Sequence, residues 1–219
     1  RLLKIASCTS KGFFLKFSIF SNLLLKYIKD RGFSINVIKC LSISTKIINF
    51  GKTKKMTTFP NAKINIGLQI TNKRGDGFHN ICTYFYPIPL FDVLDVIKNN
   101  DSKTNLFLYG RDLDGNIHDN LCVKAYNLLA KDYDIPNVNI YLYKNIPAGA
   151  GMGGGSADAT FTLKSLNKIF NLNLSVNQLK DYAEKLGSDC PFFVESVPSI
   201  GTSKGEVLAP LKRDLTKYI

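Results

Sequence analysis

The chain has 219 residues and a formal net charge of +12 at pH 7. This length fits one large domain or two small ones, and this charge would ordinarily suggest nucleic acid or an anionic membrane as a partner. The chain contains 29 Lys and Arg and 17 Asp and Glu, and residues 1–55 hold twelve of these basic residues and one of the acidic ones. Residues 56–219 therefore hold 17 basic and 16 acidic residues. The rest of the chain is nearly neutral, so we expect neither nucleic acid nor a membrane as partner.

Residues 1–55 form a basic extension before the patterned part of the chain. Its apolar run, Phe13 to Leu25, is interrupted by Lys16 and is too short to span a bilayer. Three interpretations stay open: a secretory signal, which the lack of an A-x-A-like site disfavours, an organellar transit peptide, or upstream sequence outside the working protein. We favour Met56 as the natural start. This predicts a cytoplasmic bacterial protein, or a plastid-type organelle if the extension is a transit peptide.

The cysteines and histidines argue against disulfide and metal frameworks. The five cysteines are odd in number and include no CxxC pair, so we expect reduced core residues (Cys8, Cys40, Cys82, Cys122 and Cys190). The two histidines, His79 and His118, cannot form a His-based metal cluster. Residues 111–120, RDLDGNIHDN, lack the glycine and glutamate positions of a calcium loop and predict a turn. We therefore expect no metal site built from protein side chains.

The first patterned element is NAKINIGLQI, residues 61–70. Its apolar residues alternate with polar or small ones, which predicts a strand with one buried face (Ala62, Ile64, Ile66, Leu68 and Ile70). The other face carries Lys63 and Asn65 side by side. A turn-rich loop follows at 72–80, and then β-type runs at 81–88, 91–98 and 104–110.

Helical patterns begin after these strands. We predict a helix at 120–131 with Asp119 as N-cap, a strand at 137–143, and a helix from the N-cap Ser156 to Phe170. The last of these helices has Ala159, Leu163 and Leu166 on its inner face. Residues 175–187 show a capping box, Ser175 with Gln178, and a C-terminal glycine. Strands that precede and interleave with helices indicate the α+β class.

The stretch NIPAGAGMGGGSADAT, residues 145–160, is the strongest local signal of function. A glycine-rich turn that enters a helix exposes backbone N–H groups at the positive helix end, where they can contact phosphate oxygens. GAGMGG fits the dinucleotide pattern G-x-G-x-x-G only weakly, since no acid occurs between Asp158 and Asp181. The lysine of a Walker A loop is also missing. A flexible linker is a poor alternative, because linkers do not continue into an amphipathic helix.

Three motifs together resemble one known family. P-x-G-x-G-x-G-G-G-S-x-D-A at 147–159 is similar to the ATP-phosphate loop of the GHMP kinase superfamily, and PNAKINIGL, RGDGFH and LGSDCPFF are similar to further segments of one of its branches. That branch phosphorylates a cytidine diphosphate sugar alcohol in the non-mevalonate pathway of isoprenoid biosynthesis. The resemblance covers Pro60 to about Leu211. It implies a two-layer N-terminal domain of the ribosomal protein S5 domain 2-like type.

The resemblance also implies roles for individual residues. Asp189 matches the catalytic base and Lys63 its partner, while Asn65, Phe78 and His79 match residues that bind the substrate, the last two at its cytosine. ATP, with Mg²⁺, would occupy the glycine-rich loop (Pro147, Gly149, Gly151, Gly153, Gly154, Gly155 and Ser156). Here Phe78 replaces the usual Tyr, which keeps the ring face for stacking and loses a hydroxyl.

The resemblance divides the chain into an extension at 1–55, the N-terminal kinase domain at 56–211 and the start of a truncated C-terminal portion at 212–219. A third glycine-rich motif of the family does not follow in the sequence, so we expect the polypeptide alone to have little activity. Two rivals from other classes remain: a nucleic-acid binder that uses the basic extension, and a nicotinamide-dependent oxidoreductase that rests on GAGMGG alone.

Overall fold

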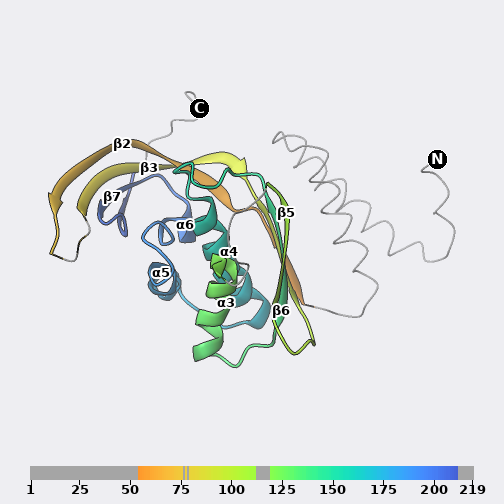
Figure 1. Ribbon diagram of the computed structural model, residues 1–219. Coiled ribbons are helices and arrows are strands. Elements are labelled where there is room, and N and C mark those ends of the chain that lie inside the picture. The colour runs from red at the N-terminus through yellow and green to blue at the C-terminus, as the bar shows by residue number, and fades with distance from the viewer. Residues whose placement is uncertain (1–53, 76, 78, 112–118, 212–219) are drawn as a thin grey trace, which may run out of the picture. The chain divides into compact units, whose positions relative to one another are not determined.

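The computed structural model describes residues 54–75, 77, 79–111 and 119–211 (Figure 1). The basic extension, Phe78, most of the predicted turn at 111–120 and residues 212–219 lie outside the described residues. The described residues form two four-stranded sheets and a group of helices, as the α+β prediction requires. Among these helices, none combines the length and the apolar character that crossing a bilayer requires.

The first sheet forms the base on which the helices pack. Its strand order is β1-β4-β6-β5, and all neighbours are antiparallel except β5 and β6. The strands are β1 (Lys55–Thr58), β4 (Val93–Lys98), β6 (Val138–Lys144) and β5 (Asn105–Gly110). Every second residue of β6 is buried, from Val138 to Lys144, so one face of this strand is turned to the core.

The second sheet is antiparallel throughout and has the order β2-β3-β7-β8. Its strands are β2 (Asn61–Lys73), β3 (His79–Phe91), β7 (Ser199–Ser203) and β8 (Val207–Pro210). The register of β2 on β3 shifts at three places along the hairpin. Such irregularities bend and twist a strand pair, and Figure 1 shows the β2–β3 hairpin as a long curved ribbon.

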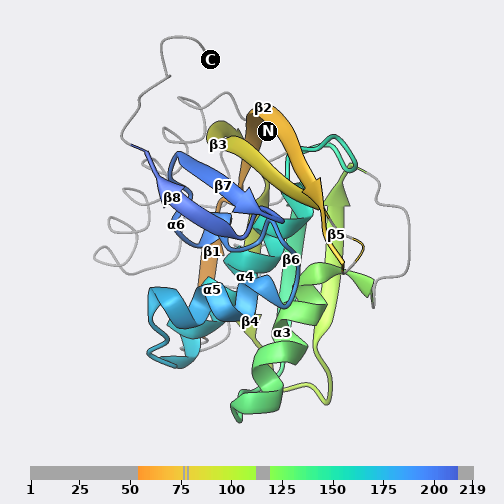
Figure 2. The same cartoon turned by 90° about the vertical axis from the view of Figure 1, so that its left-hand side faces the viewer.

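The helices lie in the angle between the two sheets (Figures 1 and 2). They are α3 (Leu121–Asp132), α4 (Gly154–Phe170), α5 (Val176–Glu184) and α6 (Phe192–Glu195). The main core joins α3, α4 and α5 to the inner face of the first sheet and includes Ala159, Leu163 and Leu166, as the helical period predicts. A smaller cluster of Phe85, Ala157, Phe192 and Phe193 links α4 and α6 to the second sheet.

Two of the predicted helix starts are wrong by a few residues. Asn120, and not Asp119, is the N-cap of α3, because its side chain accepts a hydrogen bond of 2.9 Å from the N–H of Cys122. The N-cap of α4 is Gly153, whose left-handed backbone (φ 69°) turns the chain into the helix without a side-chain cap. Ser156 therefore lies in the first turn of α4. The capping box of Ser175 and Gln178 at the start of α5 is confirmed.

The predicted buried face of β2 is wrong over its outer half. Ile66, Leu68 and Ile70 are 41%, 58% and 62% exposed, because the curved hairpin extends past the helices that cover its first residues (Figure 1). The cysteine prediction is right for Cys122 and Cys190, which are buried and unbridged. Cys82 is also unbridged but exposed, so it is no core residue.

Candidate active site

The glycine-rich loop connects the end of β6 to the start of α4. Three of its glycines, Gly149, Gly151 and Gly153, have left-handed φ angles of 70°, 71° and 69°. A Cβ on Gly149 or Gly151 would meet nothing within 4 Å, whereas a Cβ on Gly153 would lie 2.8 Å from Cζ of Phe193. Glycine is needed at the first two positions for backbone conformation and at the third also for space. Left-handed residues in such a turn let consecutive N–H groups point to one side and bind an anion.

This loop surrounds a cavity of about 430 Å³. The start of α3 lines the cavity with Asp119, Asn120 and Leu121, and two charged residues, Lys144 and Asp158, also reach it. All of the residues that the sequence predicts for phosphate binding line it (Pro147, Gly149, Gly151, Gly153, Gly154, Gly155 and Ser156). The structure therefore gathers this predicted set into one site.

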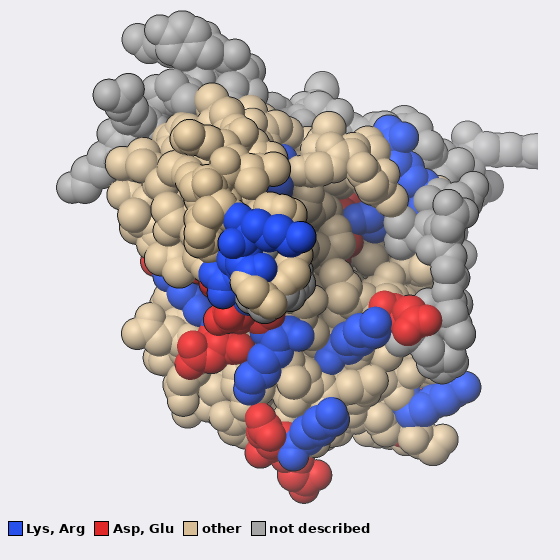
Figure 3. Space-filling model, turned by 60° about the vertical axis from the view of Figure 1, so that its left-hand side comes forward, with Lys and Arg blue, Asp and Glu red and all other residues tan. Residues whose placement is uncertain are grey.

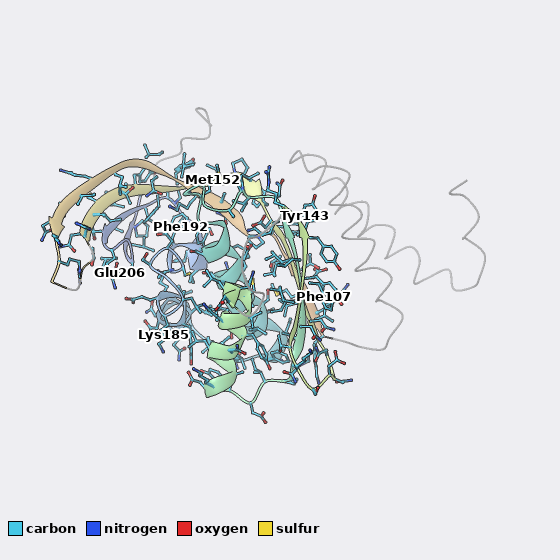
Figure 4. All side chains as sticks on the ribbon, in the orientation of Figure 1. Phe107, Tyr143, Met152, Lys185, Phe192 and Glu206 are labelled. Atoms are coloured by element: carbon cyan, nitrogen blue, oxygen red, sulfur yellow. The ribbon has the colours of Figure 1, made fainter. Side chains whose placement is uncertain are left out.

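Lys63 lies next to the end of this loop. Its backbone N–H donates to the carbonyl of Met152 at 3.0 Å, so β2 holds the loop directly; Met152 is labelled in Figure 4. Its Nζ lies 3.2 Å from Oδ2 of Asp189 and 2.5 Å from Oδ1 of Asn65. The ammonium also lies 5.1 Å from the ring centroid of Phe85. Lys63, Asn65 and Asp189 thus form one cluster beside the loop, as their placement in the sequence motifs predicts.

The Lys63 and Asp189 side chains differ in access to solvent. The Lys63 side chain is 6% exposed, whereas that of Asp189 is 32% exposed. A hydrogen bond from α4 holds the segment that carries Asp189: the Thr160 hydroxyl donates to the carbonyl of Cys190 at 2.9 Å. Burial raises the pKa of the Cys190 thiol to about 11, so this neighbour is neutral at physiological pH. The carboxylate of Asp189 is the accessible end of the pair.

The structure does not bring His79 into this cluster. His79 is the first residue of β3 and pairs with Lys73, whereas Lys63 pairs with Pro87. Ten residues of β2 therefore separate Lys63 from the partner of His79, which is on the order of 30 Å along the strand. Phe78, predicted to stack on the same base, lies outside the described residues.

Three charged residues lie beneath the loop: Asp92, Lys144 and Asp158. Asp158 is the aspartate of the loop motif, whereas Asp92 and Lys144 belong to none of the sequence motifs. The Lys144 ammonium donates to Oδ2 of Asp92 and, at 2.7 Å, to Oδ2 of Asp158. A signal for Lys144 was present, since the alternation of Val138, Ile140 and Leu142 continues to it and places it on the core face. Nothing in the local pattern marked the two aspartates as its partners.

Basic and acidic side chains are interspersed on the face drawn in Figure 3. Within the described ranges, no three His, Cys, Asp or Glu side chains come together to hold a metal ion.

Comparisons with known proteins agree with this geometry. The sequence profile described as GHMP kinases N terminal domain matches residues 120–196. The chain is 52% identical over 165 residues to a 4-diphosphocytidyl-2-C-methyl-D-erythritol kinase of Bacteroides fragilis, an alignment that covers 74% of this chain and 60% of the relative. A relative of the same description from Prochlorococcus marinus is 41% identical, with 70% of this chain and 48% of the relative covered. The chain thus spans about 60% of the length of the Bacteroides fragilis relative.

Solved structures give the same result. A crystal structure of a 4-(cytidine 5'-diphospho)-2C-methyl-D-erythritol kinase is 33% identical with a TM-score of 0.61, and 71% of this chain and 55% of that chain are covered. The mevalonate kinase of Methanococcus jannaschii, at 14% identity, 74% and 57% coverage and a TM-score of 0.53, shares the fold. The chain belongs to the GHMP kinase superfamily, of which it carries the N-terminal domain.

Proposed function

We propose that residues 56–211 are the N-terminal domain of an ATP-dependent kinase that phosphorylates the 2-hydroxyl of 4-diphosphocytidyl-2-C-methyl-D-erythritol. The observation that carries the proposal is the Lys63–Asp189 pair, with Nζ and Oδ2 3.2 Å apart, at the end of an anion-binding loop. The names of the relatives at 41–52% identity support this acceptor. A nicotinamide-dependent oxidoreductase or a nucleic-acid binder would have no need of a lysine–aspartate pair beside the loop. We therefore favour the kinase over these two classes.

The chain's own residues supply positioning and proton transfer. Asp189 presents a partly exposed carboxylate that can accept the proton of an acceptor hydroxyl. Lys63 orients that carboxylate and places a positive charge where negative charge develops during transfer. Asn65 accepts from the Lys63 ammonium at 2.5 Å, and the Phe85 ring packs near it, so the ammonium has few alternative positions.

The loop fits the phosphates of ATP, which supplies the transferred phosphoryl group when bound. Free space over Gly149 and Gly151 leaves the backbone N–H groups accessible to phosphate oxygens. The described residues form no cage of carboxylates, so Mg²⁺ would be held mainly by the phosphate oxygens and by water, as is usual for this ion at nucleotide sites. Neutralisation of phosphate charge is the chemistry that Mg²⁺ supplies there.

The position of His79 bears on the length of the acceptor. His79 lies at the start of β3, far along the hairpin from Lys63, so an acceptor that contacts both must be long or the hairpin must bend inward. This observation favours, as a second candidate, a GHMP small-molecule kinase with a shorter acceptor.

The test is a transfer assay with ATP and 4-diphosphocytidyl-2-C-methyl-D-erythritol, with the phosphorylated product detected by mass spectrometry. Because the chain spans about 60% of its relative, the assay uses the full chain and the full chain continued by the C-terminal segment of the Bacteroides fragilis relative. We expect transfer in at least the extended form, and a loss of about 10²–10⁴-fold in Asp189→Asn.

The matched control is Asp181→Asn, which removes an exposed carboxylate from α5 and should leave the rate unchanged. A rate in Asp189→Asn equal to that of the wild type would contradict the role of Asp189. Transfer to homoserine or mevalonate, without transfer to the cytidine compound, would establish the second candidate.

A further inference from the structure

The buried charges beneath the loop are not balanced. Lys144, the last residue of β6, contacts Asp92 between β3 and β4 and Asp158 in α4, and each of these side chains is at most 3% exposed. Two carboxylates and one ammonium give this group, here called the floor triad, a net charge of −1 when all three are ionised. Buried charges are costly unless they are paired and fully hydrogen-bonded.

The two carboxylates of the floor triad differ in their hydrogen bonds. Oδ1 of Asp92 accepts from the backbone N–H groups of Asn145 and Ile146 at 2.6 and 2.8 Å, and its Oδ2 accepts from Lys144. Asp158 accepts from Lys144 through Oδ2, and its buried Oδ1 accepts no hydrogen bond from the described residues. A hydrogen bond with Asp92 needs a proton on one of the two carboxyl groups. Asp92 is therefore stabilised as an anion, and Asp158 is the carboxylate with an unmet hydrogen bond.

The floor triad lies at the cavity where a polyphosphate would bind. Lys144 and Asp158 both line that cavity, and a Cβ built on Gly154 of the loop would lie 3.2 Å from Nζ of Lys144. A polyanion that enters the cavity would face a net negative group whose three side chains are each at most 3% exposed. A like charge brought close to buried carboxylates favours protonation of the least stabilised acid.

We propose that Asp158 is a further residue of the anion site, and that nucleotide binding is accompanied by uptake of one proton at its Oδ1. The proton comes from solvent, the carboxylate becomes a carboxylic acid, and the net charge of the floor triad changes from −1 to zero. Oδ1–H then becomes a hydrogen-bond donor at a position that has no partner in the ionised form. The inference rests on the proposed function, since it needs a phosphate ligand in the loop.

The groups that face Asp158 support this assignment. They are Lys144 from β6, Asp92 from the β3–β4 junction and Cys122 from α3. Burial and then the charge of Asp92 raise the pKa of Asp158 well above its usual range, against the opposing effect of Lys144. Burial raises the pKa of Cys122, so that thiol is neutral. Burial lowers the pKa of Lys144, but the two carboxylates outweigh it and raise that pKa, so the ammonium keeps its charge.

Calorimetry of the full chain with a non-hydrolysable ATP analogue and Mg²⁺ tests the proposal. Titrations at about pH 8 in Tris and in HEPES, which have different ionisation enthalpies, give the number of protons taken up per bound nucleotide. We expect uptake of up to one proton in the wild type, clearly less in Asp158→Asn, and wild-type uptake in Asp119→Asn. Asp119 is the matched control, because it lines the same cavity and its side chain is 75% exposed.

The affinity gives a second readout. Wild-type affinity should fall as pH rises, by at most about tenfold per pH unit, whereas the affinity of Asp158→Asn should change less. Equal proton uptake in the wild type and in Asp158→Asn, or binding by the wild type without any uptake, would overturn the inference and leave the kinase proposal intact. No nucleotide binding by the folded wild type would overturn both.

Stability gives a third readout that does not need the ligand. A carboxyl whose folded-state pKa is raised contributes full stability below its unfolded pKa and loses it as pH rises toward the folded value. The wild type should therefore lose stability relative to Asp158→Asn as pH rises above the usual aspartate range, as measured by urea unfolding. A constant difference between the two proteins over that range would contradict the raised pKa.

Discussion

Two lysines flank the same loop, and their aspartate partners differ. Lys63 and Lys144 are almost equally buried, with 4% and 3% exposure. The partners of Lys144 are both buried, whereas the side chain of Asp189, the partner of Lys63, is 32% exposed. The two sites therefore differ in the exposure of their carboxylates and not in that of their lysines. The Lys63–Asp189 pair can contact an acceptor, whereas Lys144 and its two aspartates stabilise the fold.

The surroundings of the two ammonium groups differ in the same way. Lys144 is held by two carboxylates, so its charge is more than compensated. Lys63 has one carboxylate, one amide oxygen and an aromatic ring as neighbours. A single negative charge faces its ammonium, so this ammonium can also attract an anionic ligand. Substitutions of the two lysines, and then of two glycines in the loop that they flank, test this difference.

The largest expected effect is that of Lys144→Met on stability. The substitution leaves two buried carboxylates without a cation, and the loss of one partner from a buried ionic group costs about 3–5 kcal/mol. The free energy of unfolding in urea measures this loss. Lys63→Met should lower the free energy of unfolding by less, since the partly exposed Asp189 carboxylate can be hydrated without a change in its position. Equal losses in the two variants would remove the distinction between the two lysines.

Lys63→Met should instead act on the transfer reaction. We expect kcat to fall by about 10²–10³-fold, since one preorganised charge near the transferred group is lost. Nucleotide affinity should change little, because the loop keeps its backbone donors. The control is Lys73→Met at the exposed end of β2, which should leave both quantities unchanged. A large loss of affinity with unchanged kcat would place Lys63 in nucleotide binding and not in the chemical step.

The smallest expected effect is the difference in the free energy of unfolding between two glycine substitutions in the loop. Gly149→Ala should lower the free energy of unfolding by about 1–2 kcal/mol, the cost of a left-handed non-glycine residue. Gly153→Ala has the same cost and also places a Cβ 2.8 Å from the Phe193 ring, which adds about 1–3 kcal/mol. Urea unfolding of both variants measures the difference. Equal losses of unfolding free energy in the two variants would mean that the Phe193 ring can move away from an added Cβ without loss of stability.

Much of the fold follows from local patterns. The helical period of α4 predicted Ala159, Leu163 and Leu166 as core residues, and the capping box predicted the start of α5. These signals are reliable because they depend on residues within a few positions of each other. The burial of the outer half of β2 could not be predicted in this way, because alternation shows which residues share a face and not whether anything covers it.

The candidate site shows the same division. Glycines at alternate positions and a following helix predict an anion-binding loop, since both features are encoded in one short segment. The resemblance placed Lys63 and Asp189 in the same site. Neither the loop sequence nor the resemblance indicated that Asp92 and Asp158 would share Lys144, since that contact joins three segments distant in the chain.

From the sequence alone, β2 to β6, α3 to α5 and the phosphate-type loop could be predicted, because hydrophobic period, caps and glycine conformations act over a few residues; β1, α6, β7 and β8 were not predicted. The tertiary structure was needed to show that β2 and the segment before α6 bring Lys63 within 3.2 Å of Asp189. It also decided that His79 lies at the far end of the hairpin and that Lys144 carries two buried aspartates. These outcomes depend on how the sheets and helices pack, and packing is set by contacts between segments that no local pattern describes.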